Sequence, residues 1–451
     1  MAAPLLPSSR IASAIAMLSI SIIAPQVATA QSLDPGPRGG APAAGGPIPG
    51  LNSIESSYFV TAQERFSAID SVLGNGNTSS GLGPRFNSNS CASCHVQPAI
   101  GGTSPKVNPQ YKVASLSGAY NTMPAFLNPA GPVREARFIN NSDGTPDGHV
   151  HQLFTIAGRN DAGGCSMAQP DFAAQTAAKN VIFRIPTPVF GLGLVEALPD
   201  ITLRNSFDAS ASQRSLLGIG GHFNISGNDG TITRFGWKAQ NKSLLIFAGE
   251  AYNVEMGVSN EIFTNEINTD SSCANPAGSP KDFTNLTIET NSGSPASDYS
   301  SDIVNFAAFS RLSAPPTPMQ PTTTTMSGRQ VFQTIRCNAC HTIKFTTGIS
   351  PTAALSGKTF SPFSDFAVHH MGSGLADGIS QGSAGGDEFR TAPLMGVGQR
   401  LFLLHDGRTG DLNQAILSHA STGSEANTVI GKYQNLDSGS VQNLLTFLRS
   451  L

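Results

Sequence analysis

Apolar residues recur with a period near 3.6 in three segments of this chain, which predicts amphipathic helices there. The segments are residues 242–252, 327–335 and 440–451. In the last segment, the positions at core spacing are Val441, Leu444, Leu445 and Leu448. Two of the three predicted helices fall in the final part of the chain, which indicates a compact helical unit at the C-terminus.

Shorter patterns occur elsewhere along the chain. Thr61, with Glu64 three residues later, forms a capping-box pattern that predicts the start of a helix. Residues 181–200 begin as a strand, but breakers interrupt the apolar run at Gly191, Gly193 and Pro199. The 451 residues include 47 Gly and 30 Pro. We therefore expect a mostly α-helical protein with extensive irregular loops.

The N-terminal segment has the features of a secretory signal. Residues 1–30 combine Arg10, an apolar run and a small-residue cleavage pattern ending at Ala30, which predicts a cleaved signal peptide and a periplasmic protein. An uncleaved anchor is the competing interpretation, although the apolar run is short for a bilayer span. The following residues 31–50 are rich in Pro, Gly and Ala, which predicts a disordered lead.

A second break in composition divides the rest of the chain. Residues 314–326 are rich in Pro and Thr, which is typical of a linker between domains. This linker separates a first domain, residues 51–313, from a second domain, residues 327–451. The net charge of −3 provides no polybasic feature, so we expect no nucleic-acid partner.

One five-residue pattern occurs once in each predicted domain. Cys91-Ala92-Ser93-Cys94-His95 and Cys337-Asn338-Ala339-Cys340-His341 both place a histidine directly after a pair of cysteines three positions apart. This is the attachment signature of haem c, in which each thiol binds a vinyl group and the histidine binds the iron. The sequence therefore predicts two covalently bound haem c groups, with His95 and His341 as axial ligands.

The size of each domain refines this prediction. A minimal cytochrome c unit has roughly 100 residues, whereas the first domain has about 260. We expect two cytochrome c-like haem domains, the first enlarged by insertions. Residues 82–90, rich in Gly, Asn and Ser, are expected to form the loop that leads to Cys91.

The cysteines of the two motifs have two alternative interpretations. A redox-active CxxC or half of a zinc site would use the same thiols, but neither explains the histidine that follows both pairs. The two remaining cysteines, Cys165 and Cys273, are expected to form a disulfide because haem c attachment and the predicted export both indicate an oxidising compartment.

The chain resembles the di-haem cytochrome c peroxidase superfamily, and within it the bacterial family of thiol oxidoreductases or di-haem peroxidases. The resemblance rests on six segments in the same order: residues 83–87 with the first motif and Gly101-Gly102, 189–196, 234–239, 250–257, 389–394 and 404–408. It implies an oxidoreductase that reduces peroxide, and a redox-active thiol is disfavoured because haem consumes the cysteines.

The ligand opposite His341 decides what the second haem can do, because a closed sixth position favours electron transfer. The available candidates are Met371, His369, His370, Met395, His405 and His419. In the relatives a distal ligand follows the His-Asp-Gly motif at about the spacing of His419, so we expect His419 to bind, with Met371 as the alternative.

For the first haem, the resemblance places Glu255 where the peroxidases keep a distal acid. A buried carboxyl group can have the raised pKa that suits proton transfer to and from peroxide. A structural acid is the competing interpretation. The site could also be closed by a sixth ligand, either Met256 or one of three histidines: His149, His151 and His222.

The only tryptophan, Trp237, aligns with a residue that relatives place between their haems. We expect it to bridge the two cofactors, although a lone Trp can also be a core residue. Electrons would come from a small cytochrome or cupredoxin, enter at the His341 haem, pass Trp237 and reduce hydrogen peroxide at the His95 haem. Oxidation of an organic or protein substrate and a non-enzymatic electron carrier are the alternatives.

Relatives also bind Ca²⁺ between the domains, but the sequence identifies no ligands for it.

Overall fold

The computed structural model describes residues 1–2, 33–75, 78–80, 82–160, 167–264 and 301–451. Contacts divide the chain into Met1–Gln31 and Ser32–Leu451, and the second unit holds all of the elements discussed below. The predicted signal peptide, Cys165 and Cys273 lie outside the described residues. In the part of the chain that is described, no helix combines the length and the apolar character needed to cross a membrane.

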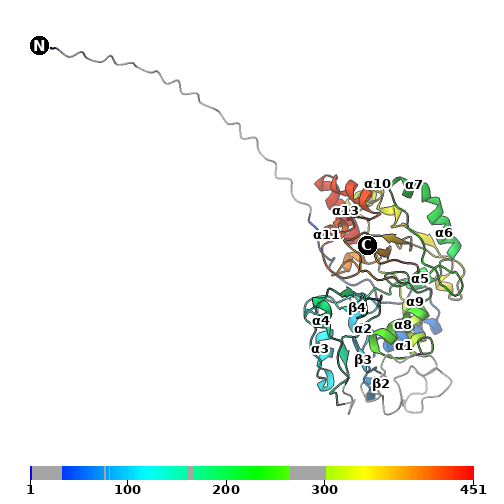
Figure 1. Ribbon diagram of the computed structural model, residues 1–451. Helices are drawn as coiled ribbons and strands as arrows, with labels where there is room; N and C mark the ends of the chain where they lie inside the picture. The colour runs from blue at the N-terminus through cyan, green and yellow to red at the C-terminus, as the bar shows by residue number, and fades with distance from the viewer. Residues whose placement is uncertain (3–32, 76–77, 81, 161–166, 265–300) are drawn as a thin grey trace. The chain divides into compact units, whose positions relative to one another are not determined.

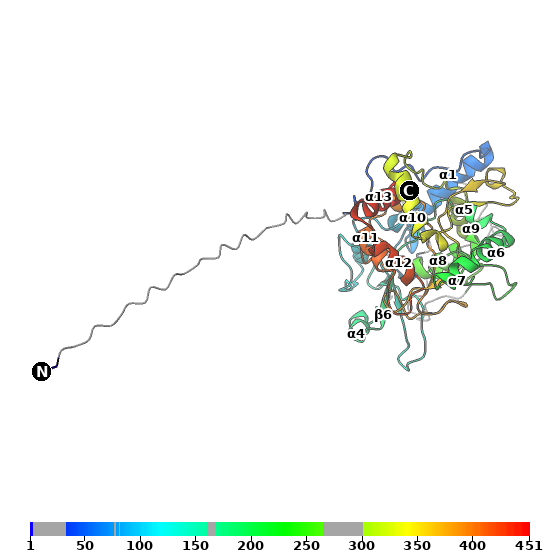
Figure 2. The same ribbon diagram turned by 90° about the horizontal axis from the view of Figure 1, so that it is seen from above.

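The unit Ser32–Leu451 consists mainly of helices and loops (Figures 1 and 2). The helices are α1 Ser53–Ser67, α2 Cys91–Cys94, α3 Gln110–Ala114, α4 Phe172–Ala177, α5 Leu192–Glu196, α6 Asp200–Ala209, α7 Ala211–Leu216, α8 Leu244–Met256, α9 Asp302–Leu312, α10 Thr323–Thr334, α11 Leu412–Leu417, α12 Asn427–Gln434 and α13 Ser438–Ser450.

The strands are short and associate in antiparallel pairs. The pairs are β1 Leu73–Asn75 with β2 Thr78–Ser80, β3 Arg85–Phe86 with β5 Phe154–Thr155, β4 Glu135–Phe138 with β6 Val181–Arg184, β7 Phe345–Thr346 with β8 Thr359–Phe360, and β9 Val368–His370 with β10 Glu388–Arg390. The prediction of a mostly helical protein with extensive loops is therefore correct in its main features.

The predicted helices at 242–252, 327–335 and 440–451 correspond to α8, α10 and α13. The prediction at Thr61 was wrong, because α1 begins at Ser53 and its capping box joins Asn52 to Glu55. Both of these residues carry side chains that cap a helix N-terminus well, but they precede the segment in which the apolar pattern was recognised. The strand prediction within residues 181–200 is confirmed by β6, although the turn-rich part also contains the short helix α5.

Aromatic rings join the helices around the first motif. Phe66 of α1 packs against Phe309 of α9 with ring centroids 4.6 Å apart. Tyr252 of α8 packs edge-on against Phe306 of α9 at 5.1 Å. Helices α1, α8 and α9 therefore share one core, on which the residues of the first motif rest.

A second core lies around α10 and α13. Phe332 of α10 packs edge-on against Phe447 of α13 at 5.8 Å. The two helices approach so closely that a Cβ atom on Gly328 would lie 2.0 Å from the carbonyl oxygen of Asn443. A glycine is therefore required at this crossing, and any side chain would force the helices apart.

Residues 33–50 were expected to be disordered, but they lie against the rest of the unit. The Asp34 carboxylate pairs with Arg449 at 2.5 Å, and both side chains are 4% exposed. Ile48 is buried, and its backbone N–H donates to the carbonyl of Leu312. Composition indicated flexibility, whereas a buried ion pair and backbone hydrogen bonds fix the segment in place.

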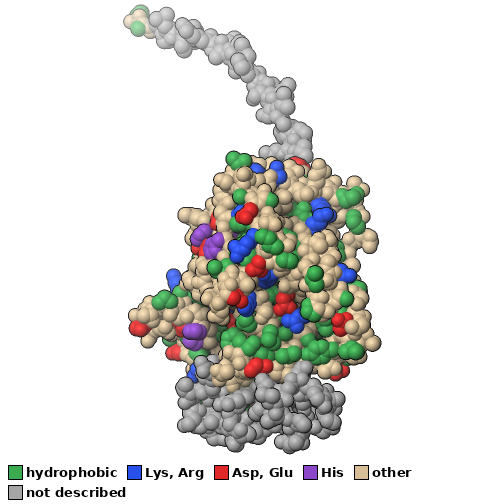
Figure 3. Space-filling model, turned by 90° about the vertical axis from the view of Figure 1, so that its right-hand side faces the viewer, with side chains coloured by type: hydrophobic (Ala, Val, Ile, Leu, Met, Phe, Trp, Pro, Cys, Tyr) green, Lys and Arg blue, Asp and Glu red, His purple; other side chains and the backbone are tan. Residues whose placement is uncertain are grey.

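The predicted linker 314–326 is partly structured as well. Its last four residues belong to α10, and its first residues pair with the lead, through Ala314 N–H to Gly46 O and Thr317 N–H to Ala43 O. The face in Figure 3 shows acidic and basic side chains of the described residues interspersed with one another.

Candidate functional site

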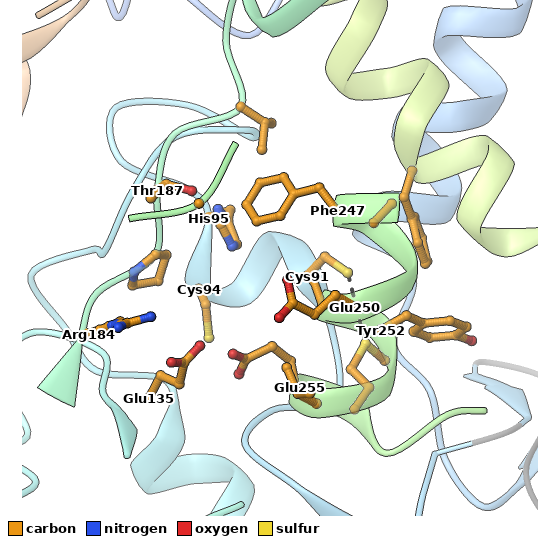
Figure 4. Close-up of a pocket in the computed structure, with 18 of the residues that line it drawn as sticks. Cys91, Cys94, His95, Glu135, Arg184, Thr187, Phe247, Glu250, Tyr252 and Glu255 are labelled. Carbon is orange, nitrogen blue, oxygen red and sulfur yellow. Dashed lines mark hydrogen bonds between the residues drawn. The ribbon is translucent and has the colours of Figure 1, made fainter. Parts of the chain in front are cut away.

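The first motif forms a single helical turn in a cavity wall. Helix α2 spans Cys91 to Cys94, and the N–H of His95 donates to the carbonyl of Cys91 at 3.0 Å. Both thiols and the His95 ring line the first cavity (Figure 4). Neither cysteine is in a disulfide, and burial raises the pKa of Cys94 to about 11. A buried, protonated thiol is a poor candidate for thiol–disulfide chemistry.

The His95 ring is held in one tautomer. Its Nδ1 lies 3.2 Å from the carbonyl oxygen of Gly102, so Nδ1 carries the proton and donates it. Burial lowers the pKa of His95 to about 4, which keeps the ring neutral at neutral pH. The Nε2 lone pair is therefore available to a metal, and the backbone carbonyl supplies the hydrogen bond that usually orients a metal-binding histidine.

Two glutamates face each other in the first cavity. Glu255 lies in the last turn of α8 and Glu135 begins β4, and Figure 4 shows both carboxyl groups pointing toward Cys94. The Asn87 amide donates to Glu255 at 3.0 Å, while Arg137 donates to Glu135 at 2.5 Å. The two carboxyl groups are close enough for each to affect the pKa of the other.

This arrangement separates the protonation states of the two acids. Burial and the neighbouring Glu135 raise the pKa of Glu255 well above its ordinary value. Although burial acts in the opposite direction, Arg137 and Arg184 lower the pKa of Glu135. The opposite shifts favour a state of the pair in which Glu255 holds the proton and Glu135 is ionised.

The other predicted ligands of the first haem do not all reach this cavity. His149 is exposed, His151 stacks on Phe138 with centroids 3.7 Å apart, and His222 pairs with Glu388 at 2.9 Å. None of the three lines the first cavity. Met256 does line it, with its sulfur 3.9 Å from that of Cys91.

The second motif lies in a second cavity, which is larger than the first. Cys337 begins a short 3₁₀ helix, and Cys340 and His341 follow it. The His341 Nδ1–H donates to the carbonyl of Phe363 at 2.8 Å. Burial lowers the pKa of His341 to about 4, and the nearby His419 ring contributes to this shift. His341 thus presents a neutral Nε2, as His95 does.

His419 faces the same cavity from the segment after α11. Its Nδ1–H donates to the carbonyl of Ala415 at 2.8 Å, and burial lowers its pKa. Its Nε2 is thereby left for a metal. Met371 and His405 also line this cavity, whereas His370 and Met395 do not.

His369 lines the second cavity, but both of its ring nitrogens are engaged. Nε2 pairs with Asp365 at 3.0 Å and Nδ1 with Glu425 at 2.7 Å. Although burial opposes the charge, Cys340 and Asp365 raise the pKa of His369 well above its ordinary value. A doubly protonated imidazole has no free lone pair, so this geometry argues against His369 as an iron ligand.

Trp237 lines the first and second cavities and also a small central cavity between Thr187 and Arg400. Its indole Nε1–H donates to the carbonyl of Ile185 at 3.0 Å, which fixes the ring. The ring also lies edge-on to His405, with centroids 6.3 Å apart. The structure thus brings the predicted bridging residue to the wall of both motif cavities.

A family model described as "Di-haem oxidoreductase, putative peroxidase" matches residues 139–451. This chain belongs to the di-haem oxidoreductase family. The match includes the second motif, Trp237 and Glu255, but it begins after the first motif and after Glu135. No match was found among curated proteins.

Solved structures with some likeness to this di-haem oxidoreductase were also found. A MauG-like protein associated with microbial copper homeostasis is 16% identical over 33% of this chain and 52% of its own, with a TM-score of 0.23. The diheme peroxidase BthA from Burkholderia thailandensis E264 is 15% identical over 48% of this chain and 65% of its own, with a TM-score of 0.29. The alignments thus span less than two thirds of either structure.

The family implies haem cofactors, and the residues of this di-haem oxidoreductase fit them. Each cavity presents two unpaired thiols and a neutral histidine from one motif. In the first cavity, the buried Nε of Arg184 has no hydrogen-bond partner among the described residues, so it can serve an acidic group of a bound cofactor. When bound, haem supplies the redox chemistry, while the protein controls access, ligation and protons.

Glu135 is the main site residue that the sequence did not identify. It lies 120 positions before Glu255. The one local indication was the alternation of Glu135 and Arg137, which places both side chains on one face of β4.

Among the described residues, one group of potential metal ligands was found, at Cys340, Asp365 and His369. Its sulfur and nitrogen atoms do not suit Ca²⁺, and a calcium site stays a prediction without assigned ligands.

Proposed function

We propose that this di-haem oxidoreductase is an exported peroxidase that reduces hydrogen peroxide in the first cavity, with electrons entering at the second. The observation that carries the proposal is the Glu135–Glu255 pair beside the first motif, in which the pKa of Glu255 is raised and that of Glu135 is lowered. The second cavity instead presents two neutral imidazoles, His341 and His419, which would close both axial positions of an iron.

Reduction of hydrogen peroxide to two water molecules consumes two electrons and two protons. Heterolysis requires a base that takes the proton from the oxygen nearer the iron and an acid that gives one to the leaving oxygen. Glu135 is ionised and can accept a proton, whereas Glu255 is protonated and can donate one. Because the two groups lie side by side, the proton that Glu135 accepts can pass to Glu255 once Glu255 has donated its own, and Arg137 favours the ionised form of Glu135 that remains.

Trp237 would connect the two cavities. Its fixed indole lines both of them, so it shortens the route through the protein that an electron would take from one motif to the other. In this proposal, His419 keeps the second site closed to peroxide, and chemistry is confined to the first site. Met371 is the alternative ligand from the same cavity.

The remaining parts of the proposal concern cofactors, partners and location. Both haems would be attached covalently through Cys91, Cys94, Cys337 and Cys340, in two cytochrome c-like domains. Attachment of haem c and the predicted signal peptide favour a periplasmic location. A small cytochrome or a cupredoxin would then supply the electrons.

The test is peroxide reduction by the haem-loaded protein with a reduced small cytochrome as donor. Glu255→Gln keeps the shape of the side chain but removes the ionisable proton, and we expect kcat/KM for peroxide to fall about 10²–10⁴-fold. Glu64→Gln, at an exposed position of α1, is the matched control and should retain wild-type activity. Wild-type protein that contains two haems but does not consume peroxide, even after partial reduction, would leave the electron carrier as the better interpretation.

A further inference from the structure

Two arginines near Trp237 have no acidic partner among the described residues: Arg390, which is buried, and Arg400, which is half-buried. Arg390 ends β10, and Arg400 follows the 3₁₀ helix Val397–Gln399. The Nε of Arg390 donates to the carbonyl of Gly236 at 2.9 Å. The Nη2 of Arg400 donates to the carbonyls of Pro393 at 3.0 Å and Met395 at 3.3 Å. Within the described part of the chain, neither guanidinium forms an ion pair.

Several other buried arginines of this protein are paired with acids. Arg137 pairs with Glu135, Arg184 pairs with Asp377 at 2.8 Å, and Arg449 pairs with Asp34. Burial lowers the pKa of Arg390 to about 10, with a contribution from Arg400, and burial alone lowers the pKa of Arg400 to about 10. Both remain charged at neutral pH. Two neighbouring cations, one buried and one half-buried, are unfavourable without an anion, so the site is suited to take up an acidic group.

The position of the two arginines indicates which anion completes the site. Both line the second cavity, together with Cys337, Cys340 and His341, and both also line the small central cavity beside Trp237. The rest of the second cavity is predominantly apolar, with side chains such as Phe332, Leu444 and Leu448. A ligand of this cavity should therefore be largely apolar and should carry its negative charge at the edge next to Trp237.

We propose that Arg390 and Arg400 bind the propionate carboxylates of the second haem. A porphyrin held by Cys337 and Cys340 has an apolar body, and its two propionates are its acidic groups. Guanidinium groups bind carboxylates through paired hydrogen bonds, for which lysine is a weaker substitute. This inference rests on the haem part of the proposed function and is independent of peroxide chemistry.

The arrangement has a consequence for electron transfer. The carboxylates would be drawn toward the central cavity, so the propionate edge of the second haem would face Trp237. The two positive charges would also stabilise the reduced haem, which has one more electron than the oxidised haem. Arg390 and Arg400 are thus positioning residues that set the orientation and the reduction potential of the second haem.

The experiment compares haem-loaded Arg390→Gln and Arg400→Gln with Arg390→Lys, Arg400→Lys and wild type. Arg329→Gln, at an exposed position of α10, is the matched control. The measurements are redox potentiometry of each haem and resonance Raman spectra of the propionate bending mode. Covalent attachment would keep the haem in the variants, and haem content per chain reports whether each of them is loaded.

We expect each Gln variant to change the reduction equilibrium constant of the second haem about tenfold, which is a decrease of ~59 mV for one electron. The propionate band should shift in both Gln variants, while the Lys variants should retain most of the potential. Unchanged spectra and potentials, or changes confined to the His95 haem, would refute the proposal. Equal losses in Lys and Gln variants would indicate a structural role and would also refute it. A shift of the wild-type potential on addition of phosphate or acetate would show that the arginines bind a free anion instead.

Discussion

The carboxyl pair in the first cavity leads to a specific prediction for Glu135→Gln. In the wild type, burial and the neighbouring Glu135 raise the pKa of Glu255. The substitution removes this negative charge but keeps an amide of nearly the same shape. Arg137 and Arg184 then lose the acid that they hold ionised. The pKa of Glu255 should therefore fall.

Coulomb's law gives the scale of the expected fall in the pKa of Glu255 when the charge of Glu135 is removed. Two unit charges about 4 Å apart interact by about 4 kcal/mol at an effective dielectric constant of 20. Asn87 and the freed Arg137 favour the ionised form of Glu255 further. Since about 1.4 kcal/mol corresponds to one pH unit, a displacement of at least about one unit is expected.

The assay is the pH dependence of kcat/KM for peroxide, measured by stopped flow. The one-proton pair is lost when pH rises through the raised pKa of Glu255, so wild-type activity should fall on that side. In Glu135→Gln this fall should begin at lower pH, and the maximal rate should also decrease because the base is missing. Glu64→Gln should follow the wild-type curve. A high-pH limb that does not move in Glu135→Gln would refute the idea that the two carboxyl groups share a proton.

Three further predictions concern other parts of the structure. His419→Ala should convert the low-spin EPR signal of the second haem to high spin, whereas His370→Ala should not; an unchanged signal would point to Met371. Trp237→Phe should slow electron transfer between the haems in flash-reduction experiments, and an unchanged rate would show that Trp237 is not on the path. The same substitution should destabilise the protein by about 1–3 kcal/mol because the Ile185 carbonyl loses its donor. Asp34→Asn should lower the free energy of unfolding by about 3 kcal/mol in denaturant titrations, because Arg449 stays buried without its partner. A change below about 0.5 kcal/mol, which is usual for surface substitutions, would mean that this pair does not hold the lead.

The sequence predicted the structure correctly near the C-terminus of the chain but not near the N-terminus. The helix predicted at 440–451 is present as α13, because its apolar spacing and its packing against α10 agree. Composition alone predicted that the lead at 31–50 is disordered. Its described residues, 33–50, are instead ordered by partners far along the chain, such as Arg449. Composition reports the intrinsic flexibility of a segment, but a buried contact with a distant residue can outweigh it.

The sequence by itself determined what depends on neighbouring residues. The two CxxCH motifs specify haem attachment because both thiols and the histidine lie within a single turn of chain. Helical periodicity similarly identifies α8, α10 and α13. Trp237 and Glu255 were identified through a family resemblance, and their surroundings were not.

Only the tertiary structure decided which distant groups meet. It placed Glu255 beside Glu135 and engaged both nitrogens of His369. It also left Arg390 and Arg400 without an acid in the part of the chain that is described. The protonation state of a buried group depends on its desolvation and on charges within a few ångströms. These neighbours come from elements far apart in the chain, so local sequence specifies the cofactors whereas the fold sets the chemistry around them.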